Sequence, residues 1–399
     1  MIARFTPCRL CGRIEVPPSK SMAHRYLIGA ALSGGVSTLS GVDFSQDILA
    51  TMDCLRAYGA EITVSGDCVR VDGARFLQAE APSLACRESG STLRFMIPLA
   101  LTLGRPVVLT GAPRLLERPL GVYEELCRER GFAFHKDATS LTVCGRLESG
   151  DYTVRGDVSS QFITGLILAL VRLGQPSTVT VTPPFESRPY VELTVSALAA
   201  FGAHVTLRDH VITVEASTLH PWAGKIEGDY SSAAFLDAFN RLGSSVELTG
   251  LAPDSLQGDR VYARYFDEIE GGTPTLDVSD CPDLGPVLFA LAALKQGATF
   301  TGTDRLRAKE SDRGAAMHGE LTKLGGGLVL GDNSVTVPRQ TLRYGGAPLW
   351  GHNDHRIVMA LSVILCQLGG ELLGVEAVAK SYPHFFEDIR KLGAEVEIQ

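Results

Sequence analysis

The feature of this sequence that most constrains its fold is an internal repeat. A helix-like stretch that ends in glycine is followed by a short strand, a polar turn and a second strand. This pattern occurs at LRAYGAEITVSGDCVRV (55–71), CRERGFAFHKDATSLTV (127–143), LAAFGAHVTLRDHVITV (198–214) and LTKLGGGLVLGDNSVTV (321–337), with a truncated copy at IRKLGAEVEI (389–398). The alternating apolar residues predict strands. The preceding glycines stand where a helix end favours a left-handed residue: Gly59, Gly131, Gly202, Gly325 and Gly393.

A second repeated element alternates with the first. It consists of a polar start followed by a helix rich in alanine and leucine. Successive starts are 70, 70, 72, 52 and 70 residues apart, near Ser19, Ser89, Ser159, Ser231, Asp283 and Asn353. Together the two elements predict six units of about 70 residues, each with two helices and a few strands. The shortest interval predicts that the fourth unit is trimmed.

Six units predict two domains of three, because one unit alone cannot bury its apolar helix. A chain of 399 residues also exceeds one ordinary core. We expect one domain at 18–226 and the other at 1–17 plus 227–399, with crossings at 17–18 and 224–228. The strand 13–16 would then complete the second domain. The alternative is an ordinary doubly wound sheet in which the spacing is coincidental.

Composition excludes several classes of function. The longest apolar stretches are near ten residues, whereas a membrane-spanning helix needs about 20, and the N-terminus lacks the apolar run of a signal peptide. The net charge of −8 argues against a general nucleic-acid or membrane surface. The nine cysteines are scattered, with Cys8 and Cys11 in the only CxxC motif, which favours free thiols in a reducing cytoplasm.

No motif points to a nucleotide, dinucleotide or metal site. The chain has no GxxxxGK[ST] and no GxGxxG after a strand. His352 and His355 form an HxxH, but no zinc pattern accompanies it. We therefore expect no cofactor and no metal.

The polar helix starts carry the residues that point to function. Lys20, His24 and Arg25 stand in the first two turns of a predicted helix, where cations oppose the helix dipole. A protein accepts that cost where an anion binds to the helix N-terminus. We expect Lys20 to be an exposed residue of such a site. Gly90 lets backbone amides approach a ligand closely, although each such start could also be an ordinary helix cap.

Further predicted helix starts are basic or rich in donors. Ser159, Ser160 and Gln161 can all donate to phosphate or carboxylate. The basic starts are Glu117-Arg118-Pro119, Ser187-Arg188-Pro189-Tyr190, Lys309-Glu310-Ser311-Asp312-Arg313, Asn353-Asp354-His355-Arg356 and Lys380-Ser381-Tyr382-Pro383. If equivalent helix ends converge in each domain, two basic faces would form a cationic cleft. That cleft would suit one or two small, multiply anionic ligands.

Taken in order, these segments resemble the EPSP synthase (3-phosphoshikimate 1-carboxyvinyltransferase) family of enolpyruvyl transferases. The similar pieces run from residue 17 to 383: PPSKSMAHR, ESGSTLR, ERPL, VSSQF, ESRPY, GDYSSAAF, the aspartate of CPDLGPVLFALA, AKESDR, NDHR and AKSYP. The resemblance implies an α/β fold of two similar domains, each of three repeated βαβαββ-type units with pseudo-threefold symmetry. It also implies an active site in the cleft between the domains.

The activity implied by the resemblance is a transfer of the enolpyruvyl group of phosphoenolpyruvate to the 5-hydroxyl of shikimate 3-phosphate. The reaction proceeds by addition and elimination through a tetrahedral intermediate. It yields 5-enolpyruvylshikimate 3-phosphate and phosphate, on the route to chorismate and the aromatic amino acids. Cations would supply the electrostatic stabilisation. We expect a monomer.

The resemblance also implies roles for individual residues. Shikimate 3-phosphate would bind to Lys20, Ser21, Arg25, Ser159, Ser160, Gln161, Ser187, Tyr190, Asp283 and Lys309. Phosphoenolpyruvate would bind to Lys20, the backbone of Gly90, Arg118, Gln161, Arg313, Arg356 and Lys380. The candidates for proton transfer are Lys20, Asp283, Lys309, Glu310 and His355. A carboxylate among so many cations should have a depressed pKa.

Two alternative functions remain open, and one residue departs from the pattern of the EPSP synthase family. One alternative is transfer to UDP-N-acetylglucosamine by the related sugar enzyme family, although the loop with that family's reactive cysteine is not found. The other is anion binding without catalysis, which would not need Asp283 and Glu310 beside the cations. The departure is Arg305, which stands where the family often has a polar or acidic residue. It would contact the substrate differently or face solvent.

Overall fold

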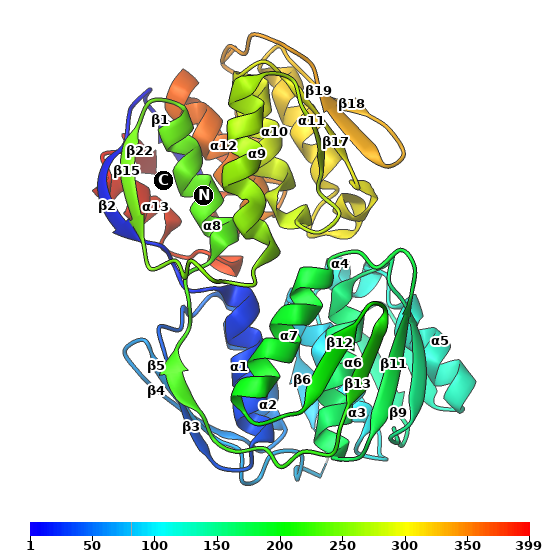
Figure 1. Cartoon of the computed structure of the whole chain (residues 1–399). Helices are drawn as coiled ribbons and strands as arrows, with labels where there is room; N and C mark the ends of the chain where they lie inside the picture. Colours follow the sequence, from blue (N-terminus) through cyan, green and yellow to red (C-terminus); the bar gives the residue numbers. More distant parts are fainter. Residues whose placement is uncertain (81) are drawn as a thin grey trace. The chain divides into compact units, whose positions relative to one another are not determined.

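The computed structural model describes residues 1–80 and 82–399, which form two compact units (Figure 1). Unit 1 comprises Met1–Pro17 and Gly228–Gln399, and unit 2 comprises Pro18–Glu227. The chain therefore leaves unit 1 after its first strands and returns to it after unit 2. Both termini belong to unit 1.

The helices of unit 2 are α1 (Lys20–Leu32), α2 (Gln46–Ala57), α3 (Gly90–Leu101), α4 (Pro113–Glu117), α5 (Gly121–Arg130), α6 (Ser160–Leu173) and α7 (Arg188–Ala200). Those of unit 1 are α8 (Tyr230–Arg241), α9 (Tyr262–Gly271), α10 (Gly285–Leu294), α11 (Arg313–Lys323), α12 (His355–Leu368) and α13 (Phe385–Lys391). Unit 1 also has the 3-10 turns η1 (Gly258–Val261), η2 (Pro282–Leu284), η3 (Asp304–Ala308) and η4 (Val375–Lys380).

The four-stranded sheets share one topology, in which a parallel pair is followed by an antiparallel hairpin. In unit 2, one sheet consists of β14 (Ala223–Lys225), β3 (Val36–Ser40), β5 (Cys68–Asp72) and β4 (Glu61–Ser65). A second sheet consists of β6 (Ser83–Ala85), β7 (Val107–Thr110), β9 (Ser140–Cys144) and β8 (Ala133–Lys136). A third consists of β10 (Asp151–Arg155), β11 (Ser177–Thr182), β13 (Val211–Val214) and β12 (Val205–Arg208). In unit 1 they are β16 (Thr275–Asp277), β17 (Ala298–Thr301), β19 (Ser334–Val337) and β18 (Val329–Leu330), and β20 (Leu349–Trp350), β21 (Gly370–Leu373), β1 (Ile2–Phe5) and β22 (Val396–Ile398).

The repeats that contain β6–β9, β10–β13 and β16–β19 read βαβαββ along the chain, with one helix inside the parallel crossover and a second before the hairpin. In the other two four-stranded sheets, β14 and β1 join from a distant part of the chain. The register shows this in the second repeat, where β6 pairs with β7 in parallel and β9 pairs antiparallel with both β7 and β8. The shortened fourth repeat has only β2 (Cys11–Glu15) and β15 (Ser245–Thr249), paired in parallel. This two-stranded sheet is the trimmed unit that the 52-residue interval predicts.

The glycines predicted to end the helices do adopt left-handed backbone angles. Gly59, Gly131, Gly202, Gly325 and Gly393 have φ values of 105°, 69°, 84°, 81° and 97°. Such values are strained for residues with a Cβ atom. Glycine at this point therefore lets the chain turn from the helix into the following hairpin.

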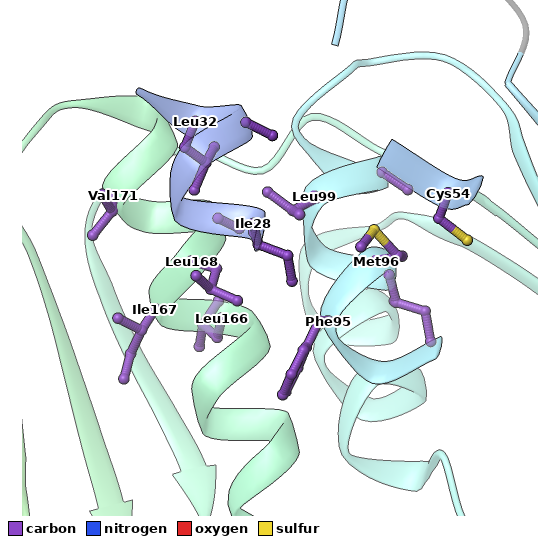
Figure 2. Close-up of a cluster of buried hydrophobic side chains, with 14 of the residues drawn as sticks. Ile28, Leu32, Cys54, Phe95, Met96, Leu99, Leu166, Ile167, Leu168 and Val171 are labelled. Carbon is purple, nitrogen blue, oxygen red and sulfur yellow. The ribbon is translucent and has the colours of Figure 1, made fainter. Parts of the chain in front are cut away.

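The crossover helices form the centre of each unit. In unit 2, α6 packs against both α3 and α1, and the ring of His24 on α1 meets that of Phe95 on α3. Figure 2 shows the apolar side chains of these helices in one cluster, with Ile28, Phe95, Leu99 and Leu168 among them. These helices are apolar on nearly every face because other helices and the sheets surround them. Each fully buried side chain of this size contributes about 1.5–3 kcal/mol. In unit 1, α8, α10 and α12 pack together in the same way.

Candidate active site

The first turns of the crossover helices meet within each unit. In unit 2, Gln161 at the start of α6 accepts a hydrogen bond from Nη1 of Arg94 on α3 at 2.6 Å. The same side chain donates to Oγ of Ser91, also on α3, at 2.9 Å. In unit 1, Arg356 on α12 donates to Ser231 on α8 at 3.1 Å. The convergence of polar helix starts that the repeat predicts therefore occurs inside each unit.

Lys20 is largely buried, which corrects the expectation that it is exposed. Its side chain is 15% exposed, and Nζ lies 2.9 Å from Oδ2 of Asp47 in the first turn of α2. An acidic residue in the first turn of a helix is favoured by the helix dipole. The dipole of α2 and the ion pair with Lys20 therefore both stabilise the negative charge of Asp47. The pair places one cation of the site between the starts of two helices.

His24 is a structural residue and not one of the site's cations. Burial, with the nearby charges of Lys20 and Arg25, holds the pKa of His24 well below its usual value, so the ring is neutral. Its Nδ1 lies 2.7 Å from Oγ1 of Thr51, which in turn lies 2.7 Å from Oγ1 of Thr92. This buried chain of hydrogen bonds joins α1, α2 and α3.

Gly90 is the first residue of α3 and lies against Arg118. A methyl group on Gly90 would lie 2.8 Å from Nη1 and 2.9 Å from Cζ of that guanidinium. Arg118 is 6% exposed. It follows α4 and does not begin a helix as predicted, because a residue before proline is driven into an extended conformation. Here Gly90 leaves space for the guanidinium at a helix N-terminus.

Arg25 joins α1 to α7. It donates to Oγ1 of Thr194 at 2.8 Å, to the Ser21 carbonyl at 2.7 Å and to the Tyr190 carbonyl at 2.8 Å. These partners are uncharged, and burial lowers the pKa of Arg25 to about 10. Tyr190 lies in the first turn of α7, which begins directly after Ser187, a residue with a left-handed φ of 52°.

Ser159 caps α6 by accepting a hydrogen bond from the amide of Gln161 at 3.3 Å, and Ser160 is buried as the first residue of that helix. These two hydroxyl groups therefore stand at the N-terminus of a long helix, where the dipole favours an anion.

In unit 1, Asp283 is the centre of a cluster of ion pairs. Its Oδ1 lies 3.1 Å from Nζ of Lys309 and 2.8 Å from Nη1 of Arg313, and its Oδ2 lies 2.9 Å from Nη2 of Arg356. Although burial opposes it, the charges of Arg356, Lys309 and Arg313 hold the pKa of Asp283 well below its usual range. The depressed pKa predicted from the sequence is confirmed.

Arg313 has two further carboxylate partners. Its Nη2 lies 2.8 Å from Oε2 of Glu310, and its Nε lies 3.0 Å from Oδ2 of the fully buried Asp354. The three cations Lys309, Arg313 and Arg356 thus face three carboxylates. Tertiary folding thus partly balances the basic residues expected in unit 1: carboxylates pair with Lys309, Arg313 and Arg356, whereas Nζ of Lys380 donates to a backbone carbonyl.

Lys309 differs from Arg313 and Arg356 in how readily it can lose its proton. Burial, only partly offset by Asp283, lowers the pKa of Lys309 to about 8, and the charge of Arg305 contributes to this shift. Arg305 is 9% exposed, so it does not face solvent. Lys309 can therefore exchange its proton near neutral pH, which Arg313 and Arg356 cannot.

The remaining predicted residues lie around α12. His355 is its buried first residue, after the N-cap Asp354. Nζ of Lys380 donates to the Asn353 carbonyl at 2.6 Å. Two predicted helix starts are corrected: Lys309 follows η3 and precedes α11, and Lys380 ends η4, so that α13 begins only at Phe385. These residues nevertheless lie beside the starts of helices.

Sequence reasoning missed the roles of Asp47, Arg94 and Asp354. Asp354 and Arg94 lie inside motifs that the sequence pointed to, and Asp354 has the further signal of an N-cap residue. Asp47 had no comparable signal, since an acidic residue early in a helix is common. Its partner Lys20 lies 27 residues away in the sequence.

Across 1–80 and 82–399, no group of three or more histidine, cysteine, aspartate or glutamate residues is arranged to hold a metal ion. In the same part of the chain, no helix combines the length and apolar character needed to span a bilayer.

Comparisons with known proteins agree with the motifs. A family model described as EPSP synthase (3-phosphoshikimate 1-carboxyvinyltransferase) matches residues 6–389. A 3-phosphoshikimate 1-carboxyvinyltransferase of Clostridium kluyveri is 40% identical over 98% of this chain and 97% of its own. One from Clostridioides difficile is 35% identical over 99% and 98%.

Solved structures show the same fold. An EPSP synthase from Acinetobacter baumannii superposes with a TM-score of 0.79 at 22% identity, over 100% of this chain and 99% of that one. The enolpyruvyl transferase NikO from Streptomyces tendae superposes with a TM-score of 0.78 at 15% identity, over 99% and 98%.

Proposed function

This chain belongs to the EPSP synthase family, and from that premise we propose how its residues divide the reaction between them. It is a transferase that moves the enolpyruvyl group of phosphoenolpyruvate to shikimate 3-phosphate, a step of aromatic amino acid biosynthesis. Transfer to UDP-N-acetylglucosamine is not favoured. The cytoplasmic location, the monomeric state and the meeting of both units around the substrates stay predictions from the sequence.

The observation that carries the proposal is the set of three ion pairs on Asp283. Cations that are already paired can exchange a carboxylate for the phosphate or carboxylate of a substrate at little cost in charge. We assign phosphoenolpyruvate to Arg313, Arg356 and Lys380 of unit 1. From unit 2, Lys20, Arg118, Gln161 and the backbone of Gly90 would join them.

Shikimate 3-phosphate is assigned mainly to unit 2. Its phosphate suits the hydroxyl groups of Ser159 and Ser160 at the α6 N-terminus. Further proposed ligands of shikimate 3-phosphate are Ser187 and Tyr190 at the start of α7, together with Ser21 and Gln161. Arg25 has most of its donors occupied by α1 and α7, so its main part would be to hold Ser21 and Tyr190 in place.

Proton transfer is assigned to the unit 1 cluster. Asp283 is ionised and can accept the proton of the 5-hydroxyl as that oxygen attacks carbon 2 of phosphoenolpyruvate. An anionic substrate that draws Arg313 and Arg356 away would raise the pKa of Asp283 toward that of an effective base. Lys309, with its pKa of about 8, and Glu310 are the candidates for giving a proton to carbon 3 and removing one later. The family resemblance adds His355 and Lys20 as further candidates for proton transfer.

The acceptor can be tested by measuring phosphate release from phosphoenolpyruvate. We expect release with shikimate 3-phosphate and none above background with UDP-N-acetylglucosamine or without an acceptor. The reason is that the comparisons place the chain with the shikimate enzymes. Release only with the nucleotide sugar would contradict the acceptor. Tight binding of both anions without release would favour the anion-binding alternative.

Gly90→Ala should impair phosphoenolpyruvate binding with little effect on stability. The added methyl group would meet the Arg118 guanidinium at 2.8 Å and displace it. A misplaced binding group of this kind can lower kcat/KM for phosphoenolpyruvate by about 10²-fold. The free energy of unfolding should change by less than about 1 kcal/mol, since alanine is a good residue in a helix. Steady-state kinetics and thermal unfolding measure the two effects.

The matched control is Gly121→Ala. Gly121 is the first residue of α5, as Gly90 is of α3, and a methyl group there would meet nothing within 4 Å. We expect normal kinetics from this variant. If Gly90→Ala also behaved normally, Arg118 would not be a ligand of phosphoenolpyruvate in the position that the structure gives it.

A further inference from the structure

The turn that leads into α12 contains two consecutive residues in the left-handed region. His352 has a φ of 51° and Asn353 a φ of 52°. Non-glycine residues seldom adopt this conformation, and they keep it only where the surrounding structure holds them. The residues 350–354, here called the α12 loop, are therefore a strained segment whose support must lie elsewhere in the fold.

The support comes from Glu320 on α11, a helix that contacts α12. Its side chain is only 3% exposed. Oε1 lies 2.8 Å from Nε2 of His352, and Oε2 accepts a hydrogen bond from the Trp350 amide at 2.9 Å. The rings of Trp350 and His352 also lie against each other, tilted by 36°, with centroids 4.3 Å apart. One buried carboxylate thus holds the loop at two points.

The negative charge of Glu320 suits this residue to hold the α12 loop. Although burial opposes it, hydrogen bonds from His352, Lys323 and the Trp350 amide hold the pKa of Glu320 below its usual value. Lys323 pairs with Oε2 at 2.8 Å and donates at 3.4 Å to the carbonyl of Pro348, which precedes the loop. The chain therefore offers a partner of Glu320 that touches the loop and one that does not.

The α12 loop is bonded to the three unit 1 residues that are assigned to phosphoenolpyruvate. The carbonyl of Asn353 accepts a hydrogen bond from Nζ of Lys380 at 2.6 Å. Asp354 accepts one from Nε of Arg313 at 3.0 Å and caps α12 through the amide of Arg356 at 2.9 Å. Lys380, Arg313 and Arg356 are each joined to this loop. A shift of the loop would move all three together.

We propose that Glu320 and His352 are positioning residues that hold the α12 loop in its strained form and so keep Lys380, Arg313 and Arg356 placed for phosphoenolpyruvate. The proposal rests on the assignment of these three residues under the proposed function. Without the carboxylate, His352 and Asn353 can relax to ordinary backbone angles. The Asn353 carbonyl and the Asp354 carboxylate then leave their partners.

The experiment compares the KM values of the two substrates in Glu320→Gln and His352→Ala. We expect KM for phosphoenolpyruvate to rise at least about tenfold in each, while KM for shikimate 3-phosphate stays within about twofold. His352→Gln, which keeps a side-chain N–H donor, should recover much of the affinity. Lys323→Met is the matched control, and we expect its two KM values to be normal.

Three results would overturn the positioning role: no rise in KM for phosphoenolpyruvate in either variant, an equal rise for both substrates, or an equal rise in Lys323→Met. If Glu320→Gln does not fold, His352→Ala carries the test, because its side chain is 21% exposed and leaves less of a cavity. Arg356→Gln is the reference for the assignment itself. If it raises KM for phosphoenolpyruvate and the loop variants do not, the positioning role is wrong and the assignment stands. If it leaves that KM unchanged, the assignment of Arg356 is wrong, whereas a rise in the loop variants would still support positioning through Lys380 and Arg313.

Discussion

Asp283→Asn is expected to lower kcat by a factor of about 10²–10⁴, the range that a general acid or base contributes. Asparagine has nearly the same shape, but it cannot accept the hydroxyl proton and it no longer attracts Lys309, Arg313 and Arg356. The fold should survive, because Arg313 keeps Glu310 and Asp354 as partners. Single-turnover kinetics and thermal unfolding would measure the two outcomes.

The pH dependence of the residual activity gives an independent readout. The charge of Asp283 raises the pKa of Lys309 against the effect of burial, which leaves it at about 8. Lys309 is protonated below that pH and loses its charge as pH rises through it. In Asp283→Asn the attraction is gone, so the basic limb of kcat/KM should move to lower pH. Asp304→Asn, at an exposed aspartate of η3, is the control and should change neither quantity. Near-normal turnover in Asp283→Asn would rule out Asp283 as the base.

Lys20→Met is expected to lower kcat/KM by about 10²–10³, as the loss of one electrostatic stabilising group does. The structure adds a second reason. Removing Lys20 leaves the carboxylate of Asp47, which is 7% exposed, without its ion-pair partner at 2.9 Å. An uncompensated negative charge at this point would repel the anionic substrates. Methionine fills similar space, so the protein should remain folded. Steady-state kinetics would show the loss.

The double variant Lys20→Met/Asp47→Asn separates the two causes. If the uncompensated charge of Asp47 matters, the double variant should be more active than Lys20→Met alone, and the double-mutant cycle should give a coupling energy of about 0.5–3 kcal/mol. Lys136→Met, at an exposed lysine of β8, controls for loss of a positive charge. Activity of Lys20→Met close to that of the unaltered enzyme would remove Lys20 from the site.

Much of the fold could be predicted because its signals are local. The glycines at the helix ends show positive φ values, and Ser19, Ser89 and Ser159 cap α1, α3 and α6 as the polar starts predict. Other starts differ by a residue or two, since Asp229 and Asp354 are the actual N-caps of α8 and α12. Capping and hydrophobic periodicity act within one or two turns, so they can be read from neighbouring residues.

The sequence by itself determined the repeat, its shortened fourth copy and the ordered set of motifs that identifies the family. Only the tertiary structure decided which charges meet. Lys20 pairs with Asp47, Gly90 makes room for Arg118, and Asp283 meets Arg356 from 73 residues away. Such contacts depend on how three helices pack, and no local pattern encodes them. For the same reason three cations from separate basic segments of the sequence, Lys309, Arg313 and Arg356, meet around one carboxylate in unit 1.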